Sequence, residues 1–319
     1  MELSKFTQKQ RMCMEKYNLE DGELEDSILR IIDYVKIGKE PSERPIAVIV
    51  GGQPGAGKSG VIGNTIEKLD SNCVVVDNDD YRHHHPRVDE INAECPEIFT
   101  ECTDQLSFAA TPRVIADLIE NKYNLVIHQT LKNDTIIKCA IKDLMEAGYT
   151  VVIRALAVSE LKSNMSMIKR CQDQIAIDGT CRWVPQNNHD YAYNGLPETV
   201  GKIEQLGAYH LLEVLTRAEN DPNHPNIIYR KRNKNMTPDQ AEVLKEHYFG
   251  GKNILEYPNA RAAVYAGRDM DLQNMLETIE EKIDVAKQRA TTPEESRRIA
   301  HLEQLHAEYT SQKAAKKPE

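Results

Sequence analysis

Residues 52–59 have the types and the spacing that bind the phosphates of a nucleotide. They read Gly-Gln-Pro-Gly-Ala-Gly-Lys-Ser and match the pattern G-x-x-x-x-G-K-[ST] at every position. Glycines allow backbone angles that bring several main-chain N–H groups close to one anion. In such a loop Lys58 neutralises the β- and γ-phosphates and Ser59 binds Mg²⁺. The predicted nucleotide-binding residues are Gly52, Gln53, Pro54, Gly55, Ala56, Gly57, Lys58, Ser59 and Gly60.

The segments on both sides of this loop have the pattern that the motif requires. Residues 46–50 are an unbroken apolar run, which is typical of a parallel strand buried on both faces. Residues 60–69 favour a helix, and its N-terminus would point its positive end at the same phosphates. A glycine-rich turn that only happens to precede a Lys-Ser pair is the alternative, and the flanking strand and helix argue against it.

Two carboxylates follow the next apolar run, residues 73–76. Because ligands of open parallel sheets lie beyond the carboxyl ends of the strands, Asp77 and Asp79 are candidates for a general base near the phosphates. An Asp-Asn-Asp turn that only caps the following segment is the alternative. Three adjacent histidines come next, but adjacent side chains do not converge on one metal ion. We therefore expect a loop beside the site, in which His85 helps to position the base.

The rest of the first 235 residues alternates between strand and helix patterns. Helices are predicted at 100–121 and 134–147, and strands at 123–130 and 150–158. This alternation indicates a parallel sheet with right-handed crossovers. The predicted fold class is α/β, a P-loop kinase-like parallel sheet flanked by helices.

Helical patterns precede and follow this region. A helix is predicted over 24–35, one short strand at 226–229, and amphipathic helices over 271–290 and 293–312. The predicted organisation is therefore a helical N-terminal extension at 1–44, a kinase domain at 45–235 and a helical C-terminal region at 236–319, packed on the kinase domain.

Composition excludes several classes of protein. The chain has 319 residues and a formal net charge of -10, which argues against a general binder of nucleic acid or of anionic membranes. The seven cysteines form no C-x-x-C pair, so we expect reduced thiols. The sequence shows neither a signal peptide nor an apolar run long enough to span a membrane. We expect a cytoplasmic protein, although a bacterial effector exported by a non-cleaved signal would have the same features.

Two arginines could brace a phosphoryl group that is being transferred. A guanidinium stays charged and offers a planar fork of donors that matches phosphate oxygens. Arg170 falls within a predicted helix and Arg182 in a less regular stretch before Pro185. From the residues alone, a surface ion-pair partner is the more common role of such an arginine.

Taken in order, these segments resemble the zeta toxin family of bacterial toxin–antitoxin systems. The resemblance covers about residues 40–235 and rests on the phosphate loop, the Val-Val-Val-Asp-Asn-Asp-Asp-Tyr strand end with a following His-Pro, the Tyr-Asn-Leu-Val-Ile-x-x-Thr strand, and Arg170. Members of the family are kinases that use ATP or GTP to phosphorylate a sugar hydroxyl of UDP-N-acetylglucosamine.

The resemblance implies a role for each matching residue. Lys58 and Ser59 would serve nucleotide and Mg²⁺, Asp79 would be the base, and Arg170 and Arg182 would brace the phosphoryl group. It also implies a nucleotide-sugar substrate and a small helical antitoxin as partner. The residues predicted on the substrate side are Asp77, Asp79, His85, His128, Thr130 and Lys132.

The chain departs from the family pattern on the acceptor side. His128 stands where the family carries a glutamate, Lys132 replaces an arginine, and Pro112 aligns with another glutamate. An imidazole can donate to a sugar or phosphate oxygen. Two alternatives therefore remain open: a kinase of another acceptor, such as the ribose of NAD or of a nucleoside, and a non-catalytic nucleotide-binding module.

Overall fold

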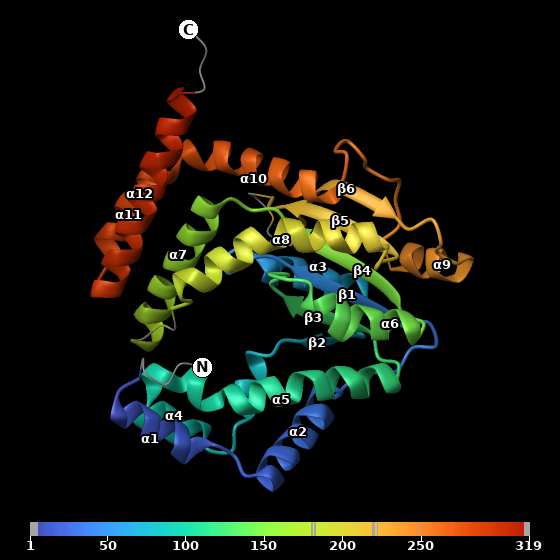
Figure 1. The fold of residues 1–319 in the computed structure, drawn as a ribbon, viewed down its shortest axis with the longest axis horizontal. Coiled ribbons are helices and arrows are strands. Elements are labelled where there is room, and N and C mark those ends of the chain that lie inside the picture. The colour runs from blue at the N-terminus through green and yellow to red at the C-terminus, as the bar shows by residue number, and fades with distance from the viewer. Residues whose placement is uncertain are drawn as a thin grey trace.

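The computed structural model describes residues 6–179, 181, 183–218, 221, 223–247 and 249–315. Its centre is a six-stranded sheet with the strand order β2-β3-β1-β4-β5-β6, and helices pack on both sides of it (Figure 1). The strands are β1 (Ile46–Gly51), β2 (Val74–Val76), β3 (Leu125–Gln129), β4 (Thr150–Leu156), β5 (Leu211–Thr216) and β6 (Asn226–Arg232).

The sheet is parallel except at one edge. β1 pairs in parallel with both β3 and β4, β2 pairs with β3, and β4 pairs with β5, whereas β6 runs antiparallel to β5. The predicted fold class is confirmed. The sequence reading missed β5, and it placed the start of β6 correctly at residue 226.

Strand β1 lies at the point where the strand order reverses. Its last residue, Gly51, is level with Gln129 on β3 and with Ala155 on β4. Crevices that bind ligands form at such a switch point, outside the carboxyl ends of the strands. The phosphate loop follows Gly51 directly and therefore begins in this crevice.

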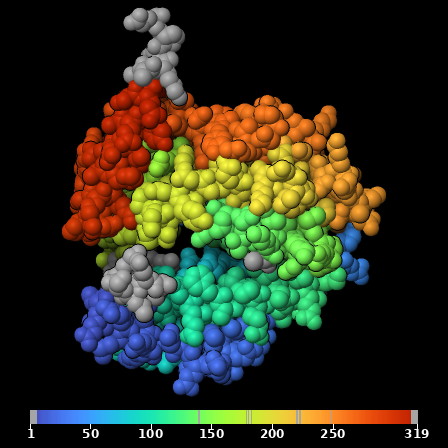
Figure 2. All heavy atoms as spheres, in the orientation of Figure 1, coloured from blue at the N-terminus to red at the C-terminus, as the bar shows by residue number. Residues whose placement is uncertain are grey.

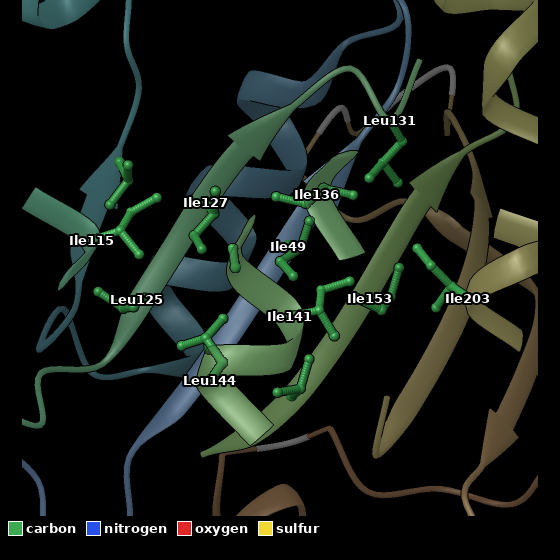
Figure 3. Packing of buried hydrophobic residues seen from close by; sticks show 14 of the residues in the cluster. Ile49, Ile115, Leu125, Ile127, Leu131, Ile136, Ile141, Leu144, Ile153 and Ile203 are labelled. Atoms are coloured by element: carbon green, nitrogen blue, oxygen red, sulfur yellow. The ribbon is translucent and has the colours of Figure 1, made fainter. Parts of the chain in front are cut away.

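Alternate residues of β1 are buried on opposite faces of the sheet. Ala47 and Ile49 belong to a core shared with α2, α5, α6, α8 and α10, and Figure 3 shows Ile49 among Ile127, Ile141 and Ile153. On the other face, the even-numbered residues Ile46, Val48 and Val50 pack towards α3 and α9. Burial on both faces explains why these strands are continuous apolar runs.

The helices fall into three groups along the chain. The first group is α1 (Gln8–Tyr17), α2 (Asp21–Val35), α3 (Lys58–Lys68), η2 (Asp80–His84), α4 (Val88–Glu94), η3 (Pro96–Ile98) and α5 (Phe99–Glu120). The second is η4 (Ile137–Ile141), α6 (Lys142–Glu146), α7 (Glu160–Asp178) and α8 (Gln186–Leu206). The third is α9 (Pro238–Glu246), α10 (Ala260–Leu276), α11 (Ile279–Arg289) and α12 (Pro293–Ala315).

The C-terminal helices correct one prediction. The helix expected over 271–290 is two helices, because α10 ends at Leu276 and α11 starts at Ile279. The apolar periodicity runs through the break, since Met275, Ile279 and Ile283 all join one cluster with α7 and α12. Figure 1 shows α11 and α12 side by side next to α7.

The helix expected over 134–147 is also interrupted. It consists of a π-helical turn, η4, followed by the short α6.

The cysteines correct another prediction. Disulfides join Cys13 to Cys95 and Cys171 to Cys181, so the expectation of reduced thiols is wrong for these four. The first pair is 82 residues apart in the sequence, and only the packing of α1 beside α4 brings it together.

Among the described residues, no helix is both long and apolar enough to cross a membrane.

Candidate active site

The phosphate loop connects β1 to α3 and takes its shape from two glycines in the left-handed region. Gly55 has a φ of 77° and Gly57 a φ of 92°. Gly55 also lies so close to α7 that a Cβ there would be 2.1 Å from the carbonyl oxygen of Ser163. Gly57 is the N-cap of α3, which starts at Lys58. The free N–H groups of this helix start, together with the loop, form a phosphate-binding concavity.

Other loop residues support this shape. Gln53 is buried, and its side-chain amide donates to the carbonyl oxygen of Val158 at 2.9 Å, which ties the loop to the end of β4. Ala56 is buried in the core under the loop, whereas Pro54 and Gly60 are half-buried. Ser59 is exposed in the first turn of α3.

The ammonium of Lys58 is buried and lies back across the loop. Its Nζ donates to the carbonyl oxygens of Gly52 at 2.7 Å and of Gln53 at 3.2 Å. Burial lowers the pKa of Lys58 to about 8; the charge of Asp77 opposes this shift, that of Arg170 adds to it, and that of Asp79 opposes it. Because all three charges act on one ammonium, the structure brings these four predicted residues to one site.

Asp77 and His128 meet at the carboxyl ends of β2 and β3. Nδ1 of His128 and Oδ2 of Asp77 are in direct hydrogen-bond contact. Burial would raise the pKa of Asp77, but the bond and charge of His128, the N–H of Asp79 and the charge of Lys58 together hold this pKa below its usual value. Asp77 is therefore ionised at neutral pH, and the histidine that replaces the family glutamate is turned towards it.

Asp79 lies beside this pair with its carboxylate half exposed. Its backbone N–H donates to Oδ1 of Asp77 at 3.0 Å. Oδ1 of Asp79 accepts from Nε of Arg82 at 3.0 Å. The bond to Arg82 thus helps to fix the direction of the carboxylate, while the side chain of Asp79 stays 54% exposed.

Arg82 is a site residue that the sequence reading did not select. Its side chain is only 4% exposed, and Nη1 donates to the carbonyl oxygen of Thr100 and to Oδ1 of Asp104 at 2.8 and 2.7 Å. The guanidinium therefore connects Asp79 to the start of α5. A basic residue three positions after a carboxylate in a helical turn was the available signal.

His85 does not contact the substrate side, and that prediction is wrong. The imidazole is buried, and its Nδ1 accepts from the backbone N–H of Arg87 at 3.1 Å. Nε2 therefore carries the proton and donates to the carbonyl oxygen of Tyr17 at 3.0 Å. Both nitrogens are bonded to backbone, so His85 fastens the end of α1 to the loop after η2.

The segment after β3 carries the remaining predicted substrate residues. Thr130 is half-buried and Lys132 is exposed, with its Nζ 5.8 Å from the ring centre of Tyr191 on α8. Gly195 allows α8 to approach this segment, because a Cβ there would lie 1.8 Å from the carbonyl oxygen of Lys132. In Figure 2 the molecular surface is hollowed between α8 and α5.

The two predicted arginines have different outcomes. Arg170 is exposed on α7, and its positive charge helps to lower the pKa of Lys58. Arg182 lies outside the described residues. No group of three or more His, Cys, Asp or Glu side chains forms a metal site within the described ranges.

Another arginine that was not predicted, Arg217, reaches the phosphate loop. It follows β5, and its Nη1 donates to the hydroxyl of Ser166 on α7 at 3.0 Å. A Cβ on Gly57 would lie 3.1 Å from both Cδ and Nε of Arg217, so this side chain lies against the loop. The strand β5, which was also not predicted, was the available signal for Arg217. Residues 211–215 are largely apolar, and Thr216 and Arg217 are the polar residues at the carboxyl end of this run.

The fold and this site define the class of protein. A glycine-rich phosphate loop at the switch point of a parallel sheet, with carboxylates beside its lysine, belongs to a P-loop phosphotransferase, that is, a kinase. More narrowly, the chain belongs to the zeta toxin family, whose model matches residues 32–234.

Individual relatives agree with this assignment. The chain is 27% identical over 238 residues to Toxin PezT of Streptococcus pneumoniae serotype 4, which covers 74% of this chain and 91% of the relative. It is 28% identical over 202 residues to Toxin zeta of Enterococcus hirae, covering 63% and 69%. A structure from the PezAT chromosomal toxin–antitoxin system of Streptococcus pneumoniae matches the fold with a TM-score of 0.58 and 23% identity, over 82% of this chain and 98% of that one. The predicted family is confirmed.

Proposed function

We propose that the chain transfers the γ-phosphate of ATP to a hydroxyl group of a nucleotide sugar of the UDP-N-acetylglucosamine type. The observation that carries this proposal is the position of the buried Lys58 in the loop after β1, beside the ends of β3 and β2, where His128 contacts Asp77. Phosphoryl transfer needs charge neutralisation and in-line positioning more than covalent chemistry. Lys58 and Arg170 would supply the positive charge, and Arg182 is proposed to join them.

The acceptor hydroxyl is proposed to lie against the exposed carboxylate of Asp79. This carboxylate would orient the hydroxyl and receive its proton late in the transfer. Thr130, Lys132 and His128 would contact the rest of the acceptor from the segment after β3. The catalytic unit proposed here comprises residues 45–235, preceded by the helices of residues 1–44 and followed by those of 236–319.

Mg²⁺ suits the residues around the loop. It prefers oxygen ligands and usually keeps several waters while it bridges phosphate oxygens. The exposed hydroxyl of Ser59 stands at the helix start, and the low pKa of Asp77 keeps that carboxylate charged. The ion would neutralise charge on the β- and γ-phosphates.

GTP is the alternative phosphate donor. Competition between ATP and GTP for binding to the wild-type protein distinguishes the two.

A different acceptor is favoured by one observation, the contact of His128 with Asp77. A glutamate at this position could not accept a bond from an ionised Asp77, whereas an imidazole donates to it and leaves its other nitrogen for an acceptor. The second candidate is therefore a kinase of the ribose of NAD or of a nucleoside. A non-catalytic nucleotide-binding module is the third, and it predicts nucleotide binding without any phosphorylated product.

One assay separates these candidates. The protein is incubated with ATP, Mg²⁺ and UDP-N-acetylglucosamine, NAD or a nucleoside, and products heavier by one phosphate are sought by mass spectrometry. Asp79→Asn should abolish the product while ATP still binds, and Lys58→Ala should weaken ATP binding. Asp89→Asn, a carboxylate on α4 outside the site, is the matched control. Unchanged turnover in Asp79→Asn would remove Asp79 from the role of base.

His128 variants test the acceptor side in particular. His128→Ala should raise KM for the acceptor and leave the Kd for ATP unchanged. His128→Glu alone should be as impaired, because it places a second carboxylate beside Asp77. Full activity of His128→Glu with UDP-N-acetylglucosamine would contradict a role for the Asp77–His128 contact.

The biological role proposed is that of a toxin acting in the cytoplasm, where nucleotide sugars are made, held inactive by a small antitoxin. The relatives named above support it through their description as toxins. Expression of the wild-type chain should stop growth, and Asp79→Asn should not. Equal growth arrest by both proteins would contradict toxicity by phosphoryl transfer.

A further inference from the structure

A groove lies between α7 and α11, beside the phosphate loop. It has a volume of about 430 Å³, and Met275 of α10 and Arg217 are among the residues that line it. On α7 the lining residues lie one turn apart at Lys162, Ser166 and Lys169, with Met165 between them. The walls from α10 and α11 fall outside residues 32–234, the region that the family model matches.

The groove combines an apolar floor with a basic rim. Met165, Met275, Val285 and Ala286 provide the apolar surface, and Glu281 is the only acid among the described lining residues. Five cationic side chains surround this floor, Lys162, Lys169, Arg217, Lys282 and Arg289, although the whole chain carries a net charge of -10. A concave site of one sign of charge attracts ligands of the opposite sign.

The pairing of these cations shows which ones are available. Asp271 binds Lys162 at 2.8 Å and Asp173 binds Arg289 at 2.6 Å. Within the described residues, Lys169, Arg217 and Lys282 form no ion pair, and Lys282 only donates to Thr278 and contacts the sulfur of Met275. Such cations without carboxylate partners can bind phosphate oxygens at little cost in existing bonds.

The groove is also connected to the phosphate loop through Arg217. That side chain lies against Gly57 at one end and bonds Ser166, a lining residue, at the other. Ser163, one turn earlier on α7, lies close to Gly55, where a Cβ would be 2.1 Å from its carbonyl oxygen. A ligand in the groove would therefore contact the same turn of α7, and the same arginine, that hold the loop.

We propose that this groove binds a nucleotide, with its base on the methionine floor and its phosphates on Lys169 and Lys282. Flat bases suit soft apolar surfaces of this kind, and the volume is in the range of small-ligand sites. The nucleotide has two sources: a second molecule, or the outer part of the donor whose γ-phosphate lies at Lys58. Only the second source rests on the function proposed above.

Equilibrium dialysis with radiolabelled ATP and Mg²⁺ tests the proposal with four proteins. They are the wild type, Lys58→Ala, the double variant Lys169→Glu/Lys282→Glu, and the control Lys287→Glu. The control makes the same charge reversal on α11 but on the side that contacts Glu303 of α12. Thermal unfolding of each protein checks that it is folded.

Each outcome decides the matter. Two molecules of ATP per wild-type chain, one of which is lost in the double variant and kept in Lys58→Ala, establish a second site. Alternatively, one molecule of ATP binds per chain, and its Kd rises about tenfold or more in the double variant but not in the control. That result assigns the groove to the donor nucleotide. If the double variant binds ATP like the wild type while Lys58→Ala does not, the groove proposal is overturned and nucleotide binding at the loop stands.

Discussion

Nε of Arg82 lies 3.0 Å from Oδ1 of Asp79, so the most exposed carboxylate of the site is held by a buried guanidinium. The other bonds of Arg82 end on Thr100 and Asp104 at the start of α5. The direction of the proposed base is therefore set by a helix about 20 residues further along the chain. A base with a fixed direction needs less reorganisation during transfer.

Replacing Arg82 should impair turnover more than nucleotide binding. Arg82→Gln loses the charged bonds to Asp79 and Asp104, which should lower the free energy of unfolding by about 2 kcal/mol, because both carboxylates keep contact with water. We expect kcat to fall while the Kd for ATP stays constant. Arg113→Gln, which breaks an exposed pair between α5 and Glu25, is the control and should change neither quantity. An unchanged kcat in Arg82→Gln would show that Asp79 needs no such support.

Binding of ATP should carry a proton into the site. Burial holds the pKa of Lys58 at about 8 in the nucleotide-free protein, compared with an ordinary value of 10.5. Phosphates beside the ammonium favour its charged form and raise this pKa. Calorimetry at pH 8.5 in two buffers of different ionisation enthalpy should therefore show proton uptake by the wild type and none by Lys58→Met. Equal binding enthalpies in both buffers would contradict this.

The lowered pKa of Lys58 also predicts how the stability of the nucleotide-free protein depends on pH. Between pH 8 and 10.5 the unfolded chain keeps a proton on Lys58 that the folded chain has lost, so stability should rise with pH across this window. The effect appears as the difference in the free energy of unfolding between the wild type and Lys58→Met, measured with urea at several pH values. A difference that falls or stays flat with rising pH would mean that the ammonium is not buried in solution.

Two glycines of α8 should respond in opposite ways to alanine. A Cβ at position 195 would lie 1.8 Å from a backbone oxygen of Lys132, whereas one at Gly201 would lie 3.2 Å from the side chain of Arg261. Gly195→Ala should displace the segment after β3, lower the free energy of unfolding by about 1–3 kcal/mol and raise KM for the acceptor. Gly201→Ala should be neutral or stabilising by up to about 1 kcal/mol. Urea unfolding and acceptor kinetics of both variants provide the test, and equal behaviour would contradict the close contact.

A buried ion pair should stabilise the sheet around β4. Glu213 on β5 bonds Nε of Arg154 at 3.1 Å and Nε of Arg230 at 2.8 Å, and Arg154 also bonds Thr65 on α3. Glu213→Gln leaves the guanidinium of Arg154 buried without its counter-charge and should cost about 3–5 kcal/mol. The double variant Arg154→Met/Glu213→Leu should recover much of this loss. Chemical denaturation measures all three proteins, and a double variant no more stable than Glu213→Gln would contradict the argument.

The sequence by itself determined the parts of the protein that local chemistry dictates. The glycines and Lys58 specify a phosphate loop because few other residues adopt its backbone angles, and apolar runs such as 46–50 specify buried parallel strands. Placing Asp77 at a strand end followed from the same logic. These features depend on neighbours in the chain, so a short window of residues is enough to recognise them.

Only the tertiary structure decided which distant segments meet. It placed β1 between β3 and β4, turned His85 towards the backbone of Tyr17 and away from the site, and brought Arg217 onto Gly57. It also broke the helix predicted over 271–290 between α10 and α11, at a point where the apolar pattern continues. Such outcomes depend on the packing of side chains that lie far apart in the sequence, and periodicity along one segment carries no information about which partner covers it.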